Sequence, residues 1–169
     1  NIRQKEFIFS RSIPTRNQLP ARLNKGGFQG SFKWNKRGPY NVGGRTRALA
    51  IDISDATDNT VIAGGVSGGM WRTVDGGATW TKTTKPEQFH SVTTLSQDIR
   101  TGQTSTWYYG TGELSGNTTG VRGAFVHGDG IYKSTDGGKS WSALSSTSSN
   151  TPQSWDSNFD YVWTVQVAP

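Results

Sequence analysis

The sequence predicts an all-β protein built from two repeated four-stranded units, and three observations support this prediction. Residues 73–80 read TVDGGATW, and residues 134–141, which lie 61 positions later, read STDGGKSW. The 22 glycines, together with seven Trp, five Tyr and seven Phe, suit short strands that are joined by tight turns. Apolar residues nowhere persist at helical spacing over three turns, so no long helix is expected.

The sequence around each copy of this eight-residue box repeats as well. The first unit has strand-like runs at 47–54, 60–65, 69–73 and 81–84, and the second at 91–99, 105–113, 130–134 and 142–145. In each unit the box separates the third run from the fourth, which begins at the Trp. Four antiparallel strands repeated at a period of about 60 residues are typical of β-propeller blades. We therefore predict two four-stranded antiparallel blades, and the first strand of a third blade within 161–169.

The residues of the box fit a turn between the third and fourth strands. The Asp can accept hydrogen bonds from backbone N–H groups further along the turn, and the Gly pair permits the positive φ that a tight hairpin needs. The Thr or Ser before the Trp can cap the turn, and the Trp can pack between neighbouring sheets. We expect a structural role, without catalysis or metal binding, for Asp75, Gly76, Gly77, Trp80, Asp136, Gly137, Gly138 and Trp141.

The charge distribution divides the chain into a basic arm and a mildly acidic body. Residues 1–47 carry a net charge of +10 and residues 48–169 a net charge of −4, which together give the overall +6. The predicted organisation is an extended basic arm at 1–33, blade 1 at 34–84, blade 2 at 85–145, and a linker with the first strand of blade 3 at 146–169. The ring is incomplete, because propellers usually need about four to eight blades.

The basic arm and the last strand both predict protein partners. A basic arm can bind nucleic acid, but this one lacks an RNA-binding signature and has apolar anchors, so we favour packing against protein. The unpaired last strand predicts that other chains, or a continuation of this polypeptide, complete the propeller. No nucleic acid partner and no membrane span are expected, because no apolar run approaches the roughly 20 residues that a span needs.

The composition and spacing of potential ligands argue against metals and cofactors. The chain has no Cys, which excludes disulfides, thiolate metal sites and thiol nucleophiles. Asp52, Asp55 and Asp58 lack the alternating pattern of a Ca²⁺ loop and are expected in a solvated turn. His127 and the other histidine, His90, show no metal-ligand spacing. We expect no metal and no cofactor.

Topology places the loops that could bind a ligand at the end of the blades opposite the boxes. These loops are 41–47, 64–69, 85–90, 113–129 and 146–160, and the long 113–129 loop is the most suggestive of function. The candidate ligand-binding residues are Arg45, Arg47, Glu113, Arg122, His127 and Asp129. They could form an anion or sugar site. The interpretation that we favour is an ion pair of Arg45 or Arg47 with Glu113 that joins the two blades.

The box resembles the Asp-box (BNR) repeat of sialidases, sortilin-like proteins and the xyloglucanase family. The longer stretch from KWNKRGPYNVGGRTRALAID through VIAGGVSGGMWRTVDGGATW and YYGTGE to GDGIYKSTDGGKSW resembles the N-terminal part of the secreted sortilin-like propeller proteins of Bacteroidota. The resemblance covers residues 34–145 well. It implies a bacterial protein that is secreted or held at the cell surface, and export by type IX secretion.

Three functional classes compete: a non-catalytic binding, adhesion or scaffolding module, a glycoside hydrolase, and a polyanion binder. Glycosidases usually need two carboxylates that flank the bond. The xyloglucanase family implies a catalytic Asp before a Gly-Gly, where this chain has Val66 and Ser67. The Arg-Ile-Pro motif of sialidases is also missing, because the Arg at 11–14 precedes a Ser. We favour the non-catalytic module, which could bind protein or carbohydrate. The alternative is a sialidase-like or xyloglucanase-like hydrolase whose remaining catalytic residues lie on missing blades.

Overall fold

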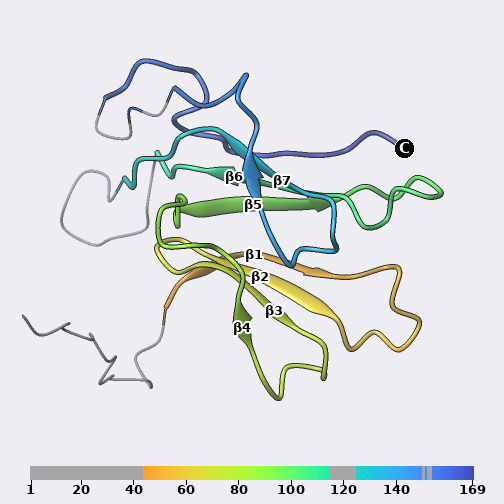
Figure 1. Cartoon of the computed structure of the whole chain (residues 1–169). Coiled ribbons are helices and arrows are strands. Elements are labelled where there is room, and N and C mark those ends of the chain that lie inside the picture. Colours follow the sequence, from red (N-terminus) through yellow and green to blue (C-terminus); the bar gives the residue numbers. More distant parts are fainter. Residues whose placement is uncertain (1–43, 115–124, 150, 152–153) are drawn as a thin grey trace, which may run out of the picture. The chain divides into compact units, whose positions relative to one another are not determined.

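The computed structural model describes residues 44–114, 125–149, 151 and 154–169, and these residues form an all-β structure. Their regular structure consists of two four-stranded antiparallel sheets, each with its strands in sequential order (Figure 1). Sheet 1 contains β1 (Thr46–Ile51), β2 (Val61–Gly65), β3 (Gly69–Thr73) and β4 (Thr81–Lys82). Sheet 2 contains β5 (Val92–Gln97), β6 (Trp107–Thr111), β7 (Ile131–Ser134) and β8 (Ser142–Ala143). The predicted fold class of two blade-like sheets is thus confirmed. The predicted arm at 1–33 lies outside the described residues, and within them no helix is long and apolar enough to cross a bilayer.

The strands follow the predicted pattern, and the two fourth strands are shorter than expected. β4 and β8 contain two residues each and begin directly after the Trp of the box, at the first residue of the predicted four-residue runs 81–84 and 142–145. In both sheets the register of the first strand shifts at the same place, between Thr46 and Ala48 and between Val92 and Thr94. Each shift is a β-bulge, which bends the strand and re-aims a side chain.

Each box forms the turn between the third and fourth strands of its sheet. All four box glycines have positive φ, from 68° at Gly76 to 94° at Gly77. Oδ1 of Asp75 accepts hydrogen bonds from the Thr79 N–H at 2.9 Å and from the Thr73 hydroxyl at 2.6 Å. The second turn repeats these contacts with Asp136, Ser140 and Ser134. The hydroxyl at the first box position, which the sequence argument did not use, also accepts a backbone N–H four residues later in both turns.

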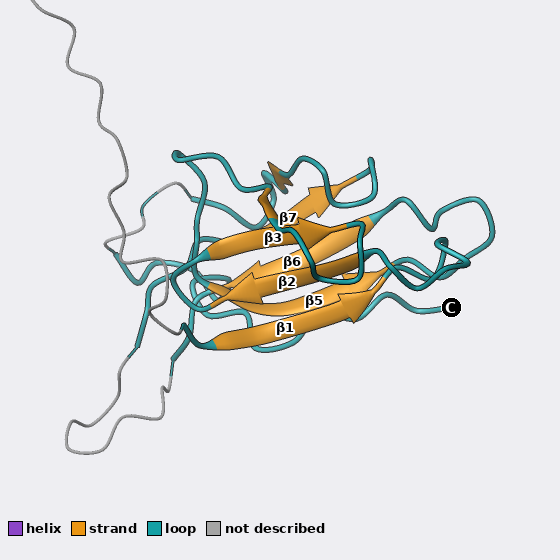
Figure 2. Cartoon of the chain, turned by 90° about the horizontal axis from the view of Figure 1, so that it is seen from below, coloured by secondary structure: helices purple, strands orange, loops and turns teal. Residues whose placement is uncertain are grey.

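The hydrophobic core lies between the two sheets. β1 and β5 lie side by side (Figure 2), so that one face of sheet 1 packs against one face of sheet 2. The rings of Tyr109 and Tyr132 stack with centroids 4.8 Å apart, and Trp141 meets Tyr109 edge-on at 4.9 Å. The buried core residues are Ala48, Ile62, Met70, Val92, Trp107, Tyr109, Tyr132 and Trp141. Burial of this apolar and aromatic surface is the main force that joins the two sheets.

Two glycines allow the next segment of chain to approach the second strand of each sheet closely. A Cβ atom at Gly64 would clash with the side chain of Val92, and one at Gly110 would clash with that of Val162. Val162 therefore occupies, relative to sheet 2, the position that Val92 occupies relative to sheet 1. This places residues 161–169 where the first strand of a third blade would begin.

Residues 161–169 do not form a strand, which differs from the expectation for this segment. Val162 donates its N–H to the Thr111 carbonyl at 2.8 Å, and Val165 and Val167 donate theirs to side-chain hydroxyls of β5. A strand needs a partner strand for its backbone groups. In the described part of the chain β5 already pairs with β6, and no further strand lies beyond this segment to pair with it.

Candidate functional site

Several predicted candidates meet at the end of the sheets that carries the β2–β3 and β6–β7 connections, which we call the loop end. The box turns lie at the other end, because Gly76 and Gly137 donate their N–H groups to the carbonyls of Asn59 and Ser105 in the β1–β2 and β5–β6 connections. At the loop end Gly69 and Gly130 instead donate to residues that lead into the next unit. The box turns are therefore at one end of the sheets, and the β2–β3 and β6–β7 connections, which differ in length, are at the other.

Glu113 is the most buried charged group at the loop end, with 0% exposure. It follows β6 and forms an isolated antiparallel bridge with Val126. Arg45, which precedes β1, donates one guanidinium nitrogen to Oε1 at 2.8 Å and pairs its other terminal nitrogen with Oε2. Arg47 donates to Oε1 at 2.5 Å. One carboxylate from sheet 2 thus accepts from two arginines of sheet 1.

This arrangement restricts what Glu113 can do chemically. Both carboxylate oxygens are occupied by guanidinium groups and the side chain has no contact with solvent. A glycosidase carboxylate must instead reach the glycosidic oxygen or the anomeric carbon. The contacts are those of an ion pair between the two sheets, and both predicted arginines take part.

The candidate Asp129 is buried and accepts hydrogen bonds from residues of a nearby loop. The candidate Arg122 lies outside the described residues. Asp129 is 3% exposed and accepts from the Ser148 hydroxyl at 2.6 Å and from the Ser149 N–H at 2.9 Å. These bonds fix the connection that leaves β8. The carboxylate thereby orders the chain leading toward the third unit.

His127 belongs to an aromatic group that the sequence argument missed. Its Nδ1 lies 3.3 Å from the Tyr161 hydroxyl, and its ring centroid lies 5.5 Å from that of Phe125 and 5.7 Å from that of Tyr161. Trp155 meets Tyr161 at 5.8 Å with an interplanar angle of 88°. The density of aromatic residues at 155, 159, 161 and 163 was the available signal. Residues from two separate segments thus form one row of rings.

Arg47 links the ion pair to the segment that carries this row. Its guanidinium carbon lies 5.3 Å from the centroid of the Trp163 ring, which is a cation–π distance. Trp163 is 54% exposed. It corresponds to Arg47, because Val162 takes the position of the first strand residue, which is Thr46 in β1 and Val92 in β5. The loop end therefore presents cationic, hydroxyl and aromatic groups together.

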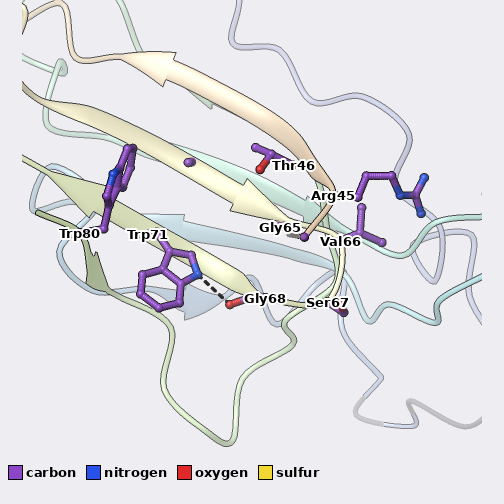
Figure 3. Close-up of a pocket in the computed structure, with 10 residues that line it drawn as sticks. Arg45, Thr46, Gly65, Val66, Ser67, Gly68, Trp71 and Trp80 are labelled. Atoms are coloured by element: carbon purple, nitrogen blue, oxygen red, sulfur yellow. Dashed lines mark hydrogen bonds between the residues drawn. The ribbon is translucent and has the colours of Figure 1, made fainter. Parts of the chain in front are cut away.

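A pocket of about 390 Å³ lies on the face of sheet 1 that points away from sheet 2 (Figure 3). Trp71 and Trp80 form one part of its wall, and Val66, Ser67 and Arg45 lie toward its other end. The Trp71 indole N–H donates to the Gly68 carbonyl at 3.0 Å. The residues that line the pocket are Gly44, Arg45, Thr46, Ala63, Gly65, Val66, Ser67, Gly68, Trp71 and Trp80.

Of the three predicted turn carboxylates of the β1–β2 connection, Asp52 and Asp55 accept hydrogen bonds from neighbouring residues. Asp55 and Asp58 are in the exposed turn as expected, but Asp52 is only 4% exposed, so the expectation that it is solvated is wrong. Its Oδ1 accepts from the Gln97 amide at 2.6 Å, which joins the two sheets at the box end. Within the described residues, no group of three or more His, Asp or Glu side chains is arranged to hold a metal ion.

Comparison with known proteins finds similarity in structure only. No protein-family model matches the sequence, and no curated protein matches it. An ancestral GH74 enzyme is similar with a TM-score of 0.41 and 17% identity, over 60% of this chain and 13% of that enzyme. The GH74 enzyme of Niastella koreensis is similar with a TM-score of 0.39 and 25% identity, over 61% of this chain and 14% of that enzyme. The chain spans about one seventh of their length, and similarity at this level decides nothing about its activity.

Proposed function

We propose that this chain is part of a β-propeller that is secreted or held at a bacterial cell surface, where it binds or scaffolds and does no chemistry. The observation that supports the proposal is that two arginines donate hydrogen bonds to the Glu113 carboxylate and that the side chain has no contact with solvent. The surface location and the export route rest on the sequence resemblance alone.

The other buried carboxylates of the loop end support the same interpretation. Asp129 accepts from Ser148 and Ser149, and Oδ2 of Asp160 accepts the N–H groups of Asp156 and Ser157 at 2.9 and 3.0 Å. Hydrolysis of a glycoside needs an acid and a base or nucleophile on either side of the bond. Asp129 and Asp160 already hold hydrogen bonds within the loops that they order, so they do not supply such a pair.

The exposed face of sheet 1 supports a further sheet as partner. In sheet 2, the side chains of Leu95, Tyr109 and Tyr132 face sheet 1. Strand pairing shows that their counterparts in sheet 1 are Leu49, Ala63 and Trp71. In sheet 2 this face is covered by Ala48, Ile62 and Met70. In sheet 1 Leu49 is 68% exposed and the pocket of Figure 3 lies open. A sheet like sheet 1, on a continuation of this polypeptide or on another chain, is the partner that fits.

The proposal is tested on the chain of residues 1–169. We expect chromogenic glycosides to remain intact, and the chain to self-associate, as measured by light scattering. Leu49→Lys should reduce self-association because it places a charge on the exposed face. Turnover that disappears in Glu113→Gln would contradict the non-catalytic role. A monomer with a sharp cooperative thermal transition would contradict the need for a further sheet.

A further inference from the structure

We propose that the pocket of Figure 3 receives a neutral aromatic side chain from the sheet that covers sheet 1, so that this partner carries one large anchor residue. The inference rests on the proposed binding function, because it names the side-chain chemistry of the partner. The pocket holds about 390 Å³, whereas an apolar cavity of about 150 Å³ already admits benzene. One aromatic side chain therefore fits within it.

The corresponding place in sheet 2 is filled by the ring of Tyr109. This ring stacks on that of Tyr132 with centroids 4.8 Å apart, and it meets Trp141 edge-on at 4.9 Å. Tyr109 is completely buried in the core that sheet 1 and sheet 2 share. Where one sheet covers the next within this chain, three rings therefore close the contact, and the central ring belongs to the covered sheet.

Sheet 1 keeps the two outer rings of this arrangement and lacks the central one. By strand pairing and box position, Trp71 and Trp80 hold the places of the outer rings, and Ala63 holds the place of Tyr109. These three residues all line the pocket, so the pocket lies where the central ring is missing. Packed protein contacts leave few voids larger than a water molecule. The covering sheet should therefore supply the ring that Ala63 does not.

The charges at the pocket disfavour a cationic anchor. Among the described residues that line it, Arg45 carries a charge and none is a carboxylate, and the Lys82 ammonium lies 6.0 Å from the Trp71 ring centroid. Ser67 follows β2 by two residues, as Glu113 follows β6, so a hydroxyl stands where sheet 2 has its acid. An arginine or lysine of the partner would meet these cations without a counter-charge, whereas a phenol or indole can bond to the hydroxyl.

The surface beside the pocket favours a side chain of a protein over a free aromatic molecule. Leu49 pairs with Ala63 across the strands and is 68% exposed, and Ile51, two residues further along β1, is 53% exposed. A small molecule in the pocket would leave both of these apolar side chains in water. A covering sheet buries them together with the pocket, as sheet 1 buries the corresponding face of sheet 2.

The test is titration of the chain of residues 1–169 with p-cresol, which reproduces a tyrosine side chain, followed by the NMR signals of the Trp71 and Trp80 indole N–H groups. Both signals should shift saturably, with a dissociation constant on the order of 1 mM. Ala63→Tyr should abolish the shifts because its ring fills the pocket. Benzamidine, which is cationic, should bind about 10-fold more weakly. Trp155→Ala, which removes an exposed Trp that does not line the pocket, is the control and should leave the affinity unchanged.

A second variant, Trp80→Ala, removes one wall of the pocket and should weaken p-cresol by about 2-fold to 10-fold. Thermal unfolding shows whether each variant keeps its fold. The anchor would be overturned by an absence of saturable shifts, by shifts that persist in folded Ala63→Tyr, or by equal binding of benzamidine. Micromolar binding of p-cresol would also overturn it, because a free molecule would then be the better occupant. If p-cresol fails to bind while Leu49→Lys still reduces self-association, only the anchor is lost and the covering sheet stands.

Discussion

Trp80 and Trp141 hold the same position in the two boxes, yet Trp80 is 41% exposed and Trp141 is 3% exposed. The Trp141 indole donates to the Thr83 hydroxyl of sheet 1 at 2.9 Å, whereas the Trp80 indole donates to Gly77 within its own turn. The difference arises because sheet 1 covers the box of sheet 2, while no described sheet covers the box of sheet 1.

The two box tryptophans should therefore differ in their contribution to stability. Trp141→Ala is expected to lower the free energy of unfolding by about 3–5 kcal/mol, and Trp80→Ala by about 1 kcal/mol or less. Chemical denaturation of both variants measures the difference. Equal losses in residues 1–169 would contradict the interpretation that burial between sheets distinguishes them.

The ion pair at the loop end predicts an asymmetry between its partners. Glu113→Gln should lower the free energy of unfolding by about 3 kcal/mol, because two guanidinium groups lose their counter-charge. Arg45→Ala or Arg47→Ala should cost less, since Glu113 keeps one arginine in either variant. Urea unfolding of the three variants tests the order. A larger loss for Arg45→Ala than for Glu113→Gln would contradict it.

The carboxylates of the boxes predict loss of stability in acid. Hydrogen bonds from Thr73 and Thr79 lower the pKa of Asp75 to about 2. Burial raises the pKa of Asp136, but hydrogen bonds from Ser140 and Ser134 outweigh this and lower its pKa to about 2. In the unfolded chain an Asp has a pKa of about 3.9. The stabilisation of the folded chain by the Asp75 and Asp136 carboxylates is therefore present above about pH 4. It is lost as the pH falls through about 2, where these two groups take up protons in the folded chain.

Denaturation between pH 2 and pH 6 measures this dependence, and Asp136→Asn supplies the comparison. The variant should be less stable than the parent at pH 6, and its stability should change less between pH 4 and pH 2. An unchanged pH profile in the variant would count against the hydrogen bonds as the source.

The contact between Gly110 and Val162 predicts coupled mutations. Gly110→Ala should destabilise by about 1–3 kcal/mol, because its Cβ would clash with the Val162 side chain. Val162→Ala should relieve part of this cost, so the double variant should be more stable than the sum of the single effects predicts. Gly44→Ala, which meets no atom within 4 Å, is the control. Strict additivity would show that residues 161–169 do not pack against β6.

The fold could be predicted because its signals are local and occur twice. The box specifies a turn through Asp75 and the glycines that follow it, and runs rich in aromatic and β-branched residues favour short strands. The short β4 and β8 could not be predicted, because the length of an edge strand depends on how its neighbour twists. The different exposure of Trp80 and Trp141 could not be predicted either, because identical motifs carry no information about which sheet lies beside them.

The candidate site could be predicted only in part. Arg45, Arg47 and Glu113 could be named in advance because blade topology places the two loops that carry them at one end of the sheets. The contact of His127 with Tyr161 spans 34 residues of sequence and crosses between units, so periodicity gave no indication of it. The geometry of the ring row depends on the tertiary structure rather than on any motif.

The bulge at the start of the first strand has a consequence for how such a protein can diversify. Arg47 and Thr93 occupy this bulge in β1 and β5, and Trp163 takes the corresponding place after Val162. A cation, a hydroxyl and an indole thus occupy corresponding positions in β1, in β5 and in residues 161–169, although the last segment forms no strand. A substitution at one of these positions would change the group presented to the neighbouring unit and leave the box turns as they are. It would also remove a contact between units, because Arg47 binds Glu113 and the Thr93 hydroxyl donates to the Val162 carbonyl.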